Sequence, residues 1–208
     1  MELDVHILKM PYTSEDIWSK CISSVEAAKL KAGFPVNIYV VDGIYGHLGA
    51  SRKRGYDAGT APYATHVDDD DWVDDDAFRC LAEHMQQGVR AITTGERLIY
   101  EDRISENVKS KHHLAVFSRK VLDEVTYEAF KYFPDQYLLS KVDPVHIEQC
   151  VYNHRISMES GSRRVRRKNS VEADRELAII RRPDLALVET ATAAEIAAAN
   201  DHLLGEGT

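Results

Sequence analysis

The feature that most constrains the fold lies near the start of the chain, where two short β-rich segments flank one helical segment. Val5–Met10 and Val36–Val41 read as strands, and Ser14–Ala32 carries apolar residues at helical spacing. Gly33 followed by Pro35 ends the helix. A strand, a helix and a strand at this spacing predict a βαβ unit. We therefore expect an α/β domain with a mostly parallel central sheet flanked by helices.

The rest of the pattern predicts shorter elements. We expect helices over Ala50–Ala58, Asp75–Gln87 and Arg119–Glu124, strands over Tyr63–Val67, Arg90–Thr94 and His113–Ser118, and a hairpin or mobile loop over Glu96–Lys111. Thr192 and Glu195 form a capping box for an alanine-rich helix. Residues 1–208 are expected to form one domain with 185–208 as a C-terminal helical tail, which packs on the body or serves an oligomer interface.

Size and composition favour a single cytoplasmic domain. The 208 residues suffice for one domain with a real core. No apolar run reaches the length of about 18 residues that a membrane span needs, and Met1–His6 lacks the features of a signal peptide. Cys21, Cys80 and Cys150 are widely spaced, so we expect reduced thiols. The net charge of −8 argues against a general nucleic-acid-coating protein.

A run of acidic residues follows the third predicted strand. Tyr63–Val67 leads directly into Asp68, Asp69, Asp70 and Asp71. Four adjacent carboxylates repel one another unless water or a cation offsets their charge. Alternation along an extended chain points Asp68 and Asp70 the same way, which suits one hard divalent cation such as magnesium or manganese. A solvated acidic turn or a cluster of helix N-caps is the alternative.

Several pieces of the chain, taken in order, resemble the family 2 glycosyltransferases. Ser51–Trp72 carries an arginine, a glycine three residues later, small residues and a strand ending in Asp-x-Asp-Asp, as that family does. Val5–Tyr12 is similar to the family's first strand, Ile17–Val25 to its first helix and Asn37–Gly43 to its second strand. Tyr152–Ser160 is similar to a late Tyr-Arg-to-Ser segment.

The resemblance implies a GT-A fold, of the nucleotide-diphospho-sugar transferase type. It also implies an enzyme that moves a sugar from a nucleotide diphosphate sugar to a hydroxyl acceptor, which is a soluble glycoside, a protein or a modified nucleic acid. Two other classes stay open. A nucleotidyltransferase of related fold is one, although the chain lacks an N-terminal glycine-rich phosphate loop. A non-catalytic nucleotide- or cation-binding module is the other.

Donor-binding residues follow from the same resemblance. Ligands of open parallel sheets bind beyond the carboxyl ends of strands, so Asp42 and the aspartate run are expected to face one crevice. The resemblance implies that Asp42 hydrogen-bonds the base or ribose, that Pro11 and Tyr12 shape the base pocket, and that Arg52 lies over the nucleotide. The alternatives are an ordinary turn residue for Asp42 and an exposed helix cation for Arg52.

The metal site is expected at Asp68 and Asp70, with Asp70 ligating the ion directly and Asp68 either sharing it or holding the ribose of the donor. His154 aligns near a position that completes the shell and would favour manganese; a surface or core histidine is the alternative. Arg155 and the basic run that begins at Arg163 suit the diphosphate oxygens. We interpret that run as a clamp over the donor, with a nucleic-acid acceptor or a solvated loop as alternatives.

The general base is the least settled role. The family places it in a Glu-Asp pair at the start of a helix, usually on the second residue, and the matching positions here are Asp135 and Gln136. Either Asp135 is the base after a one-residue shift, Asp143 is, or the reaction is not an inverting one. A helix N-cap is the alternative role for Asp135.

Overall fold

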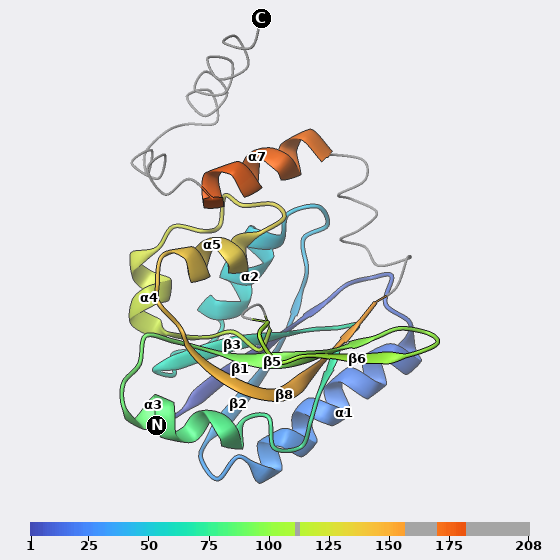
Figure 1. Cartoon of the computed structure of the whole chain (residues 1–208), viewed down its shortest axis with the longest axis vertical. Coiled ribbons are helices and arrows are strands. Elements are labelled where there is room, and N and C mark those ends of the chain that lie inside the picture. The colour runs from blue at the N-terminus through green and yellow to red at the C-terminus, as the bar shows by residue number, and fades with distance from the viewer. Residues whose placement is uncertain (111–112, 157–169, 182–208) are drawn as a thin grey trace, which may run out of the picture.

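One β-sheet with helices on both faces organises the residues that the computed structural model describes, 1–110, 113–156 and 170–181 (Figure 1). The strands are β1 (Leu3–Lys9), β2 (Val36–Asp42), β3 (Tyr63–Asp68), β4 (Trp72–Val73), β5 (Ala91–Ile99), β6 (Ile104–Asn107), β7 (Val116–Ser118) and β8 (Val145–Arg155). The helices are α1 (Glu15–Lys31), α2 (Leu48–Asp57), the 3-10 turn Arg79–Leu81, α3 (Ala82–Gln86), α4 (Arg119–Glu124), α5 (Pro134–Ser140) and α7 (Ser170–Arg181).

The predicted βαβ unit is present. β1 pairs in parallel with β2 from Leu3 opposite Val36 onward, and α1 crosses over between them. The helix buries Cys21, Val25 and Ala28 against the sheet. Burying a side chain such as that of Val25 contributes about 1.5–3 kcal/mol, which explains why the apolar spacing of this segment forms a helix docked on the sheet.

The sheet is mixed, with parallel and antiparallel pairs of strands. The strand order is β2-β1-β3-β7-β5-β8-β4, with β6 paired to β5. β2, β1 and β3 are mutually parallel, and β5 is parallel to β8. The other pairs, β3 with β7, β5 with β7, β5 with β6 and β4 with β8, are antiparallel. The expected α/β domain is therefore confirmed, with a mixed sheet.

Two segments differ in detail from the sequence-based expectation. The helix predicted over Asp75–Gln87 is confined to Arg79–Gln86. The acidic residues that precede it contact strands of the sheet, as Asp76 accepts a hydrogen bond from Gln149 Nε2 of β8 at 2.9 Å. Asp74 accepts hydrogen bonds from Arg97 Nη1 at 2.6 Å and Asn153 Nδ2 at 2.9 Å. Of the two options left open for Glu96–Lys111, the hairpin is correct, since β5 continues to Ile99 and returns as β6.

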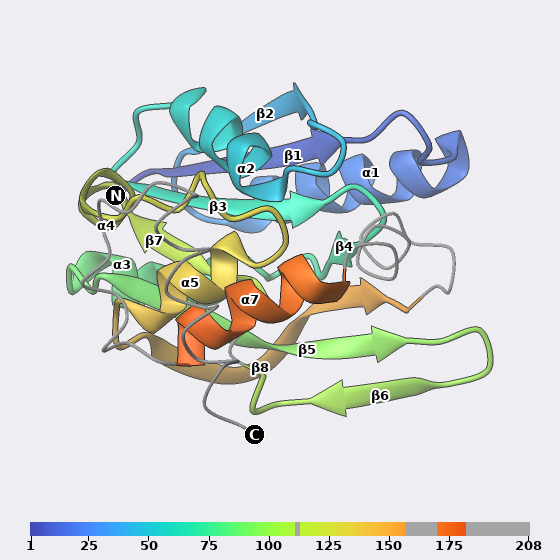
Figure 2. The ribbon, with the colours of Figure 1, turned by 90° about the horizontal axis from the view of Figure 1, so that it is seen from above.

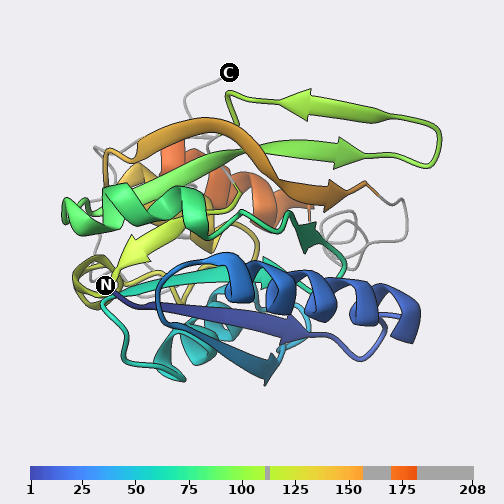
Figure 3. The same cartoon turned by 90° about the horizontal axis from the view of Figure 1, so that it is seen from below.

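The two faces of the sheet carry separate hydrophobic clusters. α2, α4, α5 and α7 cover one face (Figure 2), and α1 and α3 lie on the other (Figure 3). On the α1 face, the cluster includes Val25, Phe78 and Met85. On the α2 face it includes Tyr56 and Leu138, with the half-buried isoleucines of α7 packed against it. The second cluster ties α7 to the body of the domain.

Among the described helices, none combines the length and the apolar character needed to cross a bilayer. The basic run Arg163–Lys168 and the capping box at Thr192 lie outside the described residues, as does the tail 185–208. Their predicted roles stay predictions.

Candidate active site

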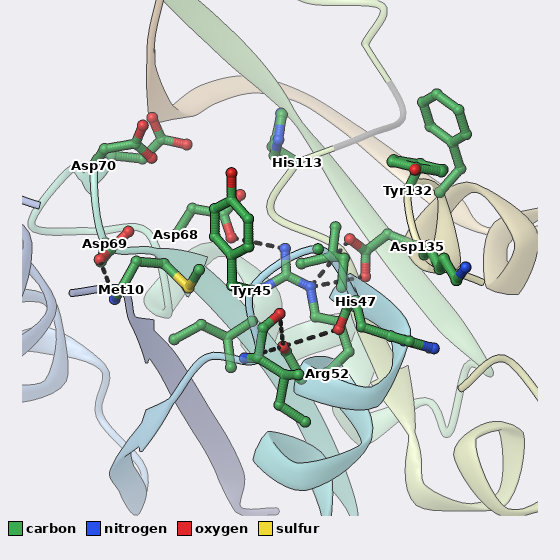
Figure 4. Close-up of a pocket in the computed structure, with 18 of the residues that line it drawn as sticks. Met10, Tyr45, His47, Arg52, Asp68, Asp69, Asp70, His113, Tyr132 and Asp135 are labelled. Atoms are coloured by element: carbon green, nitrogen blue, oxygen red, sulfur yellow. Dashed lines mark hydrogen bonds and ion pairs between the residues drawn. The ribbon is translucent and has the colours of Figure 1, made fainter. Parts of the chain in front are cut away.

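A cavity of about 370 Å³ opens beyond the carboxyl ends of β1 and β3 (Figure 4). It brings together most of the residues that the sequence singled out: Tyr12, Arg52, Asp68, Asp70, Asp135, His154 and Arg155. These residues come from β3, α2, α5, β8 and the loops that follow β1 and β3, so the sheet edge gathers side chains more than 140 positions apart in the chain.

The aspartate run forms a turn at the end of β3. The strand stops at Asp68, and the backbone N–H of Asp71 donates to the Asp68 carbonyl at 3.0 Å. Asp69 accepts the Met10 N–H at 2.7 Å. Because the chain turns after Asp68, simple strand alternation does not govern where Asp70 points.

Asp71 locks this turn to strand β8. Its carboxylate accepts the Tyr152 hydroxyl at 2.8 Å and the Arg155 backbone N–H at 2.7 Å. The Tyr152 hydroxyl also accepts the Asp68 N–H at 3.2 Å. All four aspartates line the cavity, but Asp69 and Asp71 are buried whereas Asp68 and Asp70 are half-buried.

The carboxyl groups of Asp68, Asp70 and Asp71 have different pKa values because their surroundings differ. Burial, together with repulsion from Asp68 and Asp69, raises the pKa of Asp70 to about 6. Burial also raises the pKa of Asp71 well above its usual range. Burial alone would raise the pKa of Asp68 too, but the Arg52 guanidinium overrides it and lowers that pKa. Asp68 is therefore a stable anion, whereas Asp70 would gain from a nearby cation.

Arg52 is buried beneath the cavity, with 1% of its surface exposed. Its Nη2 donates to Asp68 Oδ1 at 2.7 Å, and its Nε donates to the Asp135 carboxylate at 3.1 and 3.2 Å (Figure 4). The alternative of an exposed helix cation is therefore wrong. Gly55, three residues later, allows this placement, because a Cβ there would lie 2.3 Å from the His6 ring. Arg52 joins the aspartate turn to the segment that carries Asp135.

Asp135 lies in the first turn of α5 and is itself buried, with 5% exposed. It is not the N-cap, which is Phe133. His66 Nε2 lies 3.6 Å from Asp135 Oδ2, and the Tyr56 hydroxyl is 3.1 Å from His66 Nδ1. Burial lowers the pKa of His66 well below its usual value, so the ring is neutral. The Tyr56 hydroxyl can donate to Nδ1 only in the tautomer that carries the ring proton on Nε2, the nitrogen nearer Asp135.

Asp143, the other candidate base, is exposed and is not among the residues that line the cavity.

Two histidines and a glutamate stand beside the aspartate turn. Glu96 Oε2 is 2.6 Å from His113 Nδ1 and 3.4 Å from His154 Nδ1. Burial opposes protonation of His154, but the hydrogen bond to Glu96 and the charge of Asp71 outweigh it and raise its pKa to about 9. In the described part of the chain, the ligand atoms of Glu96, His113 and His154 lie within 4.8 Å of one another, as do those of Asp68, Asp71 and His113.

The predicted metal set is thus only partly assembled as expected. Asp68, Asp70 and His154 line one cavity. In the described part of the chain, however, the two groups of ligand atoms that lie close together are Glu96–His113–His154 and Asp68–Asp71–His113, and neither includes Asp70.

Another part of the cavity lining is apolar and aromatic. Met10, Tyr12, Ile44 and Tyr45 line it, and the rings of the two tyrosines meet edge to face with centroids 6.3 Å apart. Of the residues expected to bind the base, Tyr12 is therefore well placed.

Pro11 and Asp42 are not part of this wall. Both are exposed, and neither belongs to the cavity lining. For Asp42 the reason lies in the strand order, because β1 stands between β2 and β3. The expectation that Asp42 and the aspartate run share one crevice is corrected accordingly. The Asp42 carbonyl instead accepts a hydrogen bond from Arg54 Nη1 at 2.9 Å.

Sequence reasoning missed Glu96, His113, Tyr45 and the segment Lys131–Phe133, all of which line or support the cavity. Glu96 lay in a segment predicted to be irregular, and only the long-range pairing of β5 with β8 places it beside His154. No local pattern signals such a contact. Tyr45 stood within the loop after the second strand, where its aromatic character was the one available hint.

The family model described as Glycosyl transferase family 2 matches residues 22–173, well over half of the chain. The chain therefore belongs to the family 2 glycosyl transferases, which confirms the resemblance inferred from its sequence. No curated protein matches the chain.

Solved structures of similar fold include Staphylococcus aureus TarS in complex with UDP-GlcNAc. That comparison has a TM-score of 0.59 at 12% identity and covers 83% of this chain and 66% of the TarS chain. For TarS in complex with UDP the TM-score is 0.57 at 13% identity, over 83% of this chain and 65% of that chain. This chain thus spans less than two thirds of those TarS chains.

A mutant Drosophila β-1,4-galactosyltransferase 7 in complex with manganese, UDP-Gal and xylobiose is also similar. Its TM-score is 0.51 at 9% identity, over 74% of this chain and 70% of that one. At such low identities these likenesses establish the GT-A fold alone.

Proposed function

We propose that the chain transfers a sugar from a nucleoside diphosphate sugar to a hydroxyl acceptor with the help of a divalent cation. One observation carries the proposal: a single cavity holds the Asp68–Asp71 turn, and Arg52 links that turn to a buried carboxylate, Asp135. A site for a charged leaving group and a candidate base thus lie side by side. The UDP and UDP-GlcNAc complexes of the similarly folded TarS support the choice of donor class.

The side chains around Asp70 fit a divalent cation. The pKa of Asp70 is raised to about 6 by burial and by repulsion from its neighbours, so a positive charge there is stabilising. Carboxylate oxygens bind magnesium or manganese, and a histidine nitrogen among the ligands favours manganese over magnesium. We assign Asp68 and Asp70 as ligands, with His154 beside them. A cation held there supplies the charge that stabilises a diphosphate leaving group.

The remaining walls bind and orient the donor. Tyr12 and Tyr45 offer ring faces and edges on which a nucleobase can pack. Arg155 lines the cavity next to the aspartate turn, where its guanidinium suits phosphate oxygens. The backbone of Arg155 is already fixed by Asp71, so the side chain starts from a defined position.

Asp135 is the carboxylate that we assign as general base. It lines the cavity, and Arg52 Nε donates to both of its oxygens at 3.1 and 3.2 Å, which holds the carboxylate in place. A base held in this way accepts the proton of the acceptor hydroxyl as the new glycosidic bond forms, and it gains by not having to reorient. Gln136, which also lines the cavity, cannot take up a proton in this role.

Donor hydrolysis tests the proposal directly. The chain is incubated with UDP-sugars and GDP-sugars, with manganese or with chelator, and free sugar and nucleoside diphosphate are measured. We expect slow, metal-dependent release of both products, since water replaces the missing acceptor. A nucleotidyltransferase would instead release pyrophosphate from a nucleoside triphosphate. A folded chain that binds a nucleotide yet releases no sugar from any donor would refute the proposal.

A further inference from the structure

Helix α7 supports the cavity wall through Glu176, a residue beyond the part of the chain that the family model matches. The match ends at residue 173, whereas Glu176 lies three residues further along α7. The helix packs beside α5 on the same face of the sheet (Figure 2). Its Ala173 is fully buried, and Ile179 and Ile180 pack against the second hydrophobic cluster. These contacts dock α7 on the domain.

Glu176 binds three successive backbone N–H groups. Its Oε1 accepts the Lys131 N–H at 2.6 Å, and its Oε2 accepts those of Tyr132 at 2.9 Å and Phe133 at 3.1 Å. The side chain has 8% of its surface exposed. Hydrogen bonds to an ionised carboxylate are shorter and stronger than those between neutral groups. Removing the Glu176 carboxylate would leave three backbone N–H groups without their acceptor. A buried carboxylate used in this way fixes the backbone of the segment.

A second glutamate of α7 holds the side chains of the same segment. Glu172 pairs with the Lys131 ammonium and accepts the Tyr132 hydroxyl at 3.1 Å. From the opposite side, α2 binds the same stretch, because the Leu48 N–H donates to the Lys131 carbonyl at 3.0 Å. Gly49 permits this close approach, since a Cβ there would lie 2.3 Å from the Phe130 carbonyl oxygen. The segment is held between α2 and α7.

The segment matters because it forms part of the cavity and leads into Asp135. Lys131, Tyr132 and Phe133 all line the cavity, and Pro134 begins α5 directly after them. Asp135 follows, paired with Arg52. A shift of the Lys131–Phe133 backbone would therefore move both the cavity wall and the start of the helix that carries the carboxylate.

We propose that α7 positions the reaction site, with Glu176 as the positioning residue that fixes the Lys131–Phe133 wall and, through it, Asp135. The inference rests on the proposed function, because Asp135 is a base only if the chain transfers sugars. The cation and diphosphate side of the cavity, built from β3 and β8, makes no use of Glu176.

The test compares Glu176→Gln with Asp174→Asn in the full chain. The first variant keeps the shape of the side chain but removes a carboxylate oxygen and the charge. The second removes the same charge from an exposed position on the same helix. Amide hydrogen exchange at residues 131–133, affinity for UDP with manganese, and turnover per folded molecule are measured for each.

We expect faster exchange at residues 131–133 and a roughly 10- to 100-fold lower turnover for Glu176→Gln, since misplacing catalytic groups costs about that much. Its affinity for UDP with manganese should stay unchanged, and Asp174→Asn should behave like the wild type. Glu176→Ala, which removes both oxygens, should show a larger loss than Glu176→Gln.

Two results would overturn the inference. One is faster exchange with unchanged turnover. The other is a fall in turnover and nucleotide affinity together, in proportion to unfolded protein, which is what a purely structural role produces. A wild-type chain with no turnover on any donor would refute the proposed function and this inference with it, whereas the exchange measurement would still report whether Glu176 holds the segment.

Discussion

Replacing Arg52 by methionine would expose how far the site depends on one buried cation. The guanidinium is 2.7 Å from Asp68 Oδ1 and 3.1 Å from Asp135 Oδ2, and Arg52 is 1% exposed. Methionine keeps an unbranched apolar stem but leaves the Asp135 carboxylate buried beside it without its cation. Removing one partner of a buried ion pair costs about 3–5 kcal/mol. In a domain of this size that lowers the Tm by roughly 6–20 °C.

Chemical unfolding in urea at neutral pH measures this loss, with Arg54→Met as the matched control. Arg54 lies on the same helix but is exposed, so its replacement should change the free energy of unfolding by less than about 0.5 kcal/mol. Equal stability of the two variants would show that Arg52 does not stabilise the fold through its ion pairs with Asp68 and Asp135. A double variant, Arg52→Met with Asp135→Asn, should regain part of the loss, since it removes the unpaired charge.

The stability lost in Arg52→Met should also depend on pH in a defined direction. Arg52 overrides the effect of burial and lowers the pKa of Asp68 in the folded chain. A lowered folded-state pKa stabilises the fold above the unfolded value of about 3.9, and that stabilisation disappears as the pH falls through the folded pKa. The difference in the free energy of unfolding between the wild type and Arg52→Met should therefore become smaller under acidic conditions. A gap that widens toward low pH would contradict the assigned role.

Three further predictions concern single residues. Asp70→Ala should abolish the manganese-dependent part of the stabilisation by UDP, roughly 2.7 kcal/mol at a hundredfold excess over Kd, while Asp75→Ala retains it; thermal shift with and without chelator decides. Asp135→Asn should lower turnover by roughly 10²–10⁴ with donor affinity kept, whereas Asp143→Asn should not, and the reverse pattern would move the base to Asp143. The pKa of His154, raised to about 9, implies a stabilisation that is present below about pH 6.5 and lost as the pH rises through 9. The stability of His154→Gln should accordingly fall less than that of the wild type between pH 7 and about 9.5, as urea midpoints can show.

The parts of the fold that the sequence predicted are those with strong local patterns. The apolar spacing of Ser14–Ala32 and the flanking β-rich runs specify the βαβ unit without outside help. The second half of the sheet has no such signal. β4 has two residues and β7 has three, too few for a period to register, so long-range pairing decides their place. The same limit applies to the direction of β5 relative to its neighbours.

Some features of the candidate site could likewise be predicted from local sequence, and others depend on tertiary contacts. The aspartate turn was visible because its four acidic residues are adjacent and directly follow a strand. The burial of Arg52 could not be predicted, because its neighbours Lys53 and Arg54 give the segment the pattern of an exposed basic helix face. Only the tertiary contacts with Asp68 and Asp135 explain it. The error for Asp42 arose in the same way, because the sequence does not reveal that β1 separates β2 from β3.

The carboxylate assigned as base is held from two directions, and this links the fold to the proposed chemistry. Arg52 on α2 binds the Asp135 side chain, and Glu176 on α7 binds the backbone that precedes it. The first contact comes from a segment that the family model matches, and the second from beyond its last matched residue. A domain cut at residue 173 would keep the aspartate turn and Arg52 but lose Glu176 and its three hydrogen bonds to the Lys131–Phe133 backbone. The geometry of the base therefore depends on a contact made by the part of α7 that lies beyond the family match.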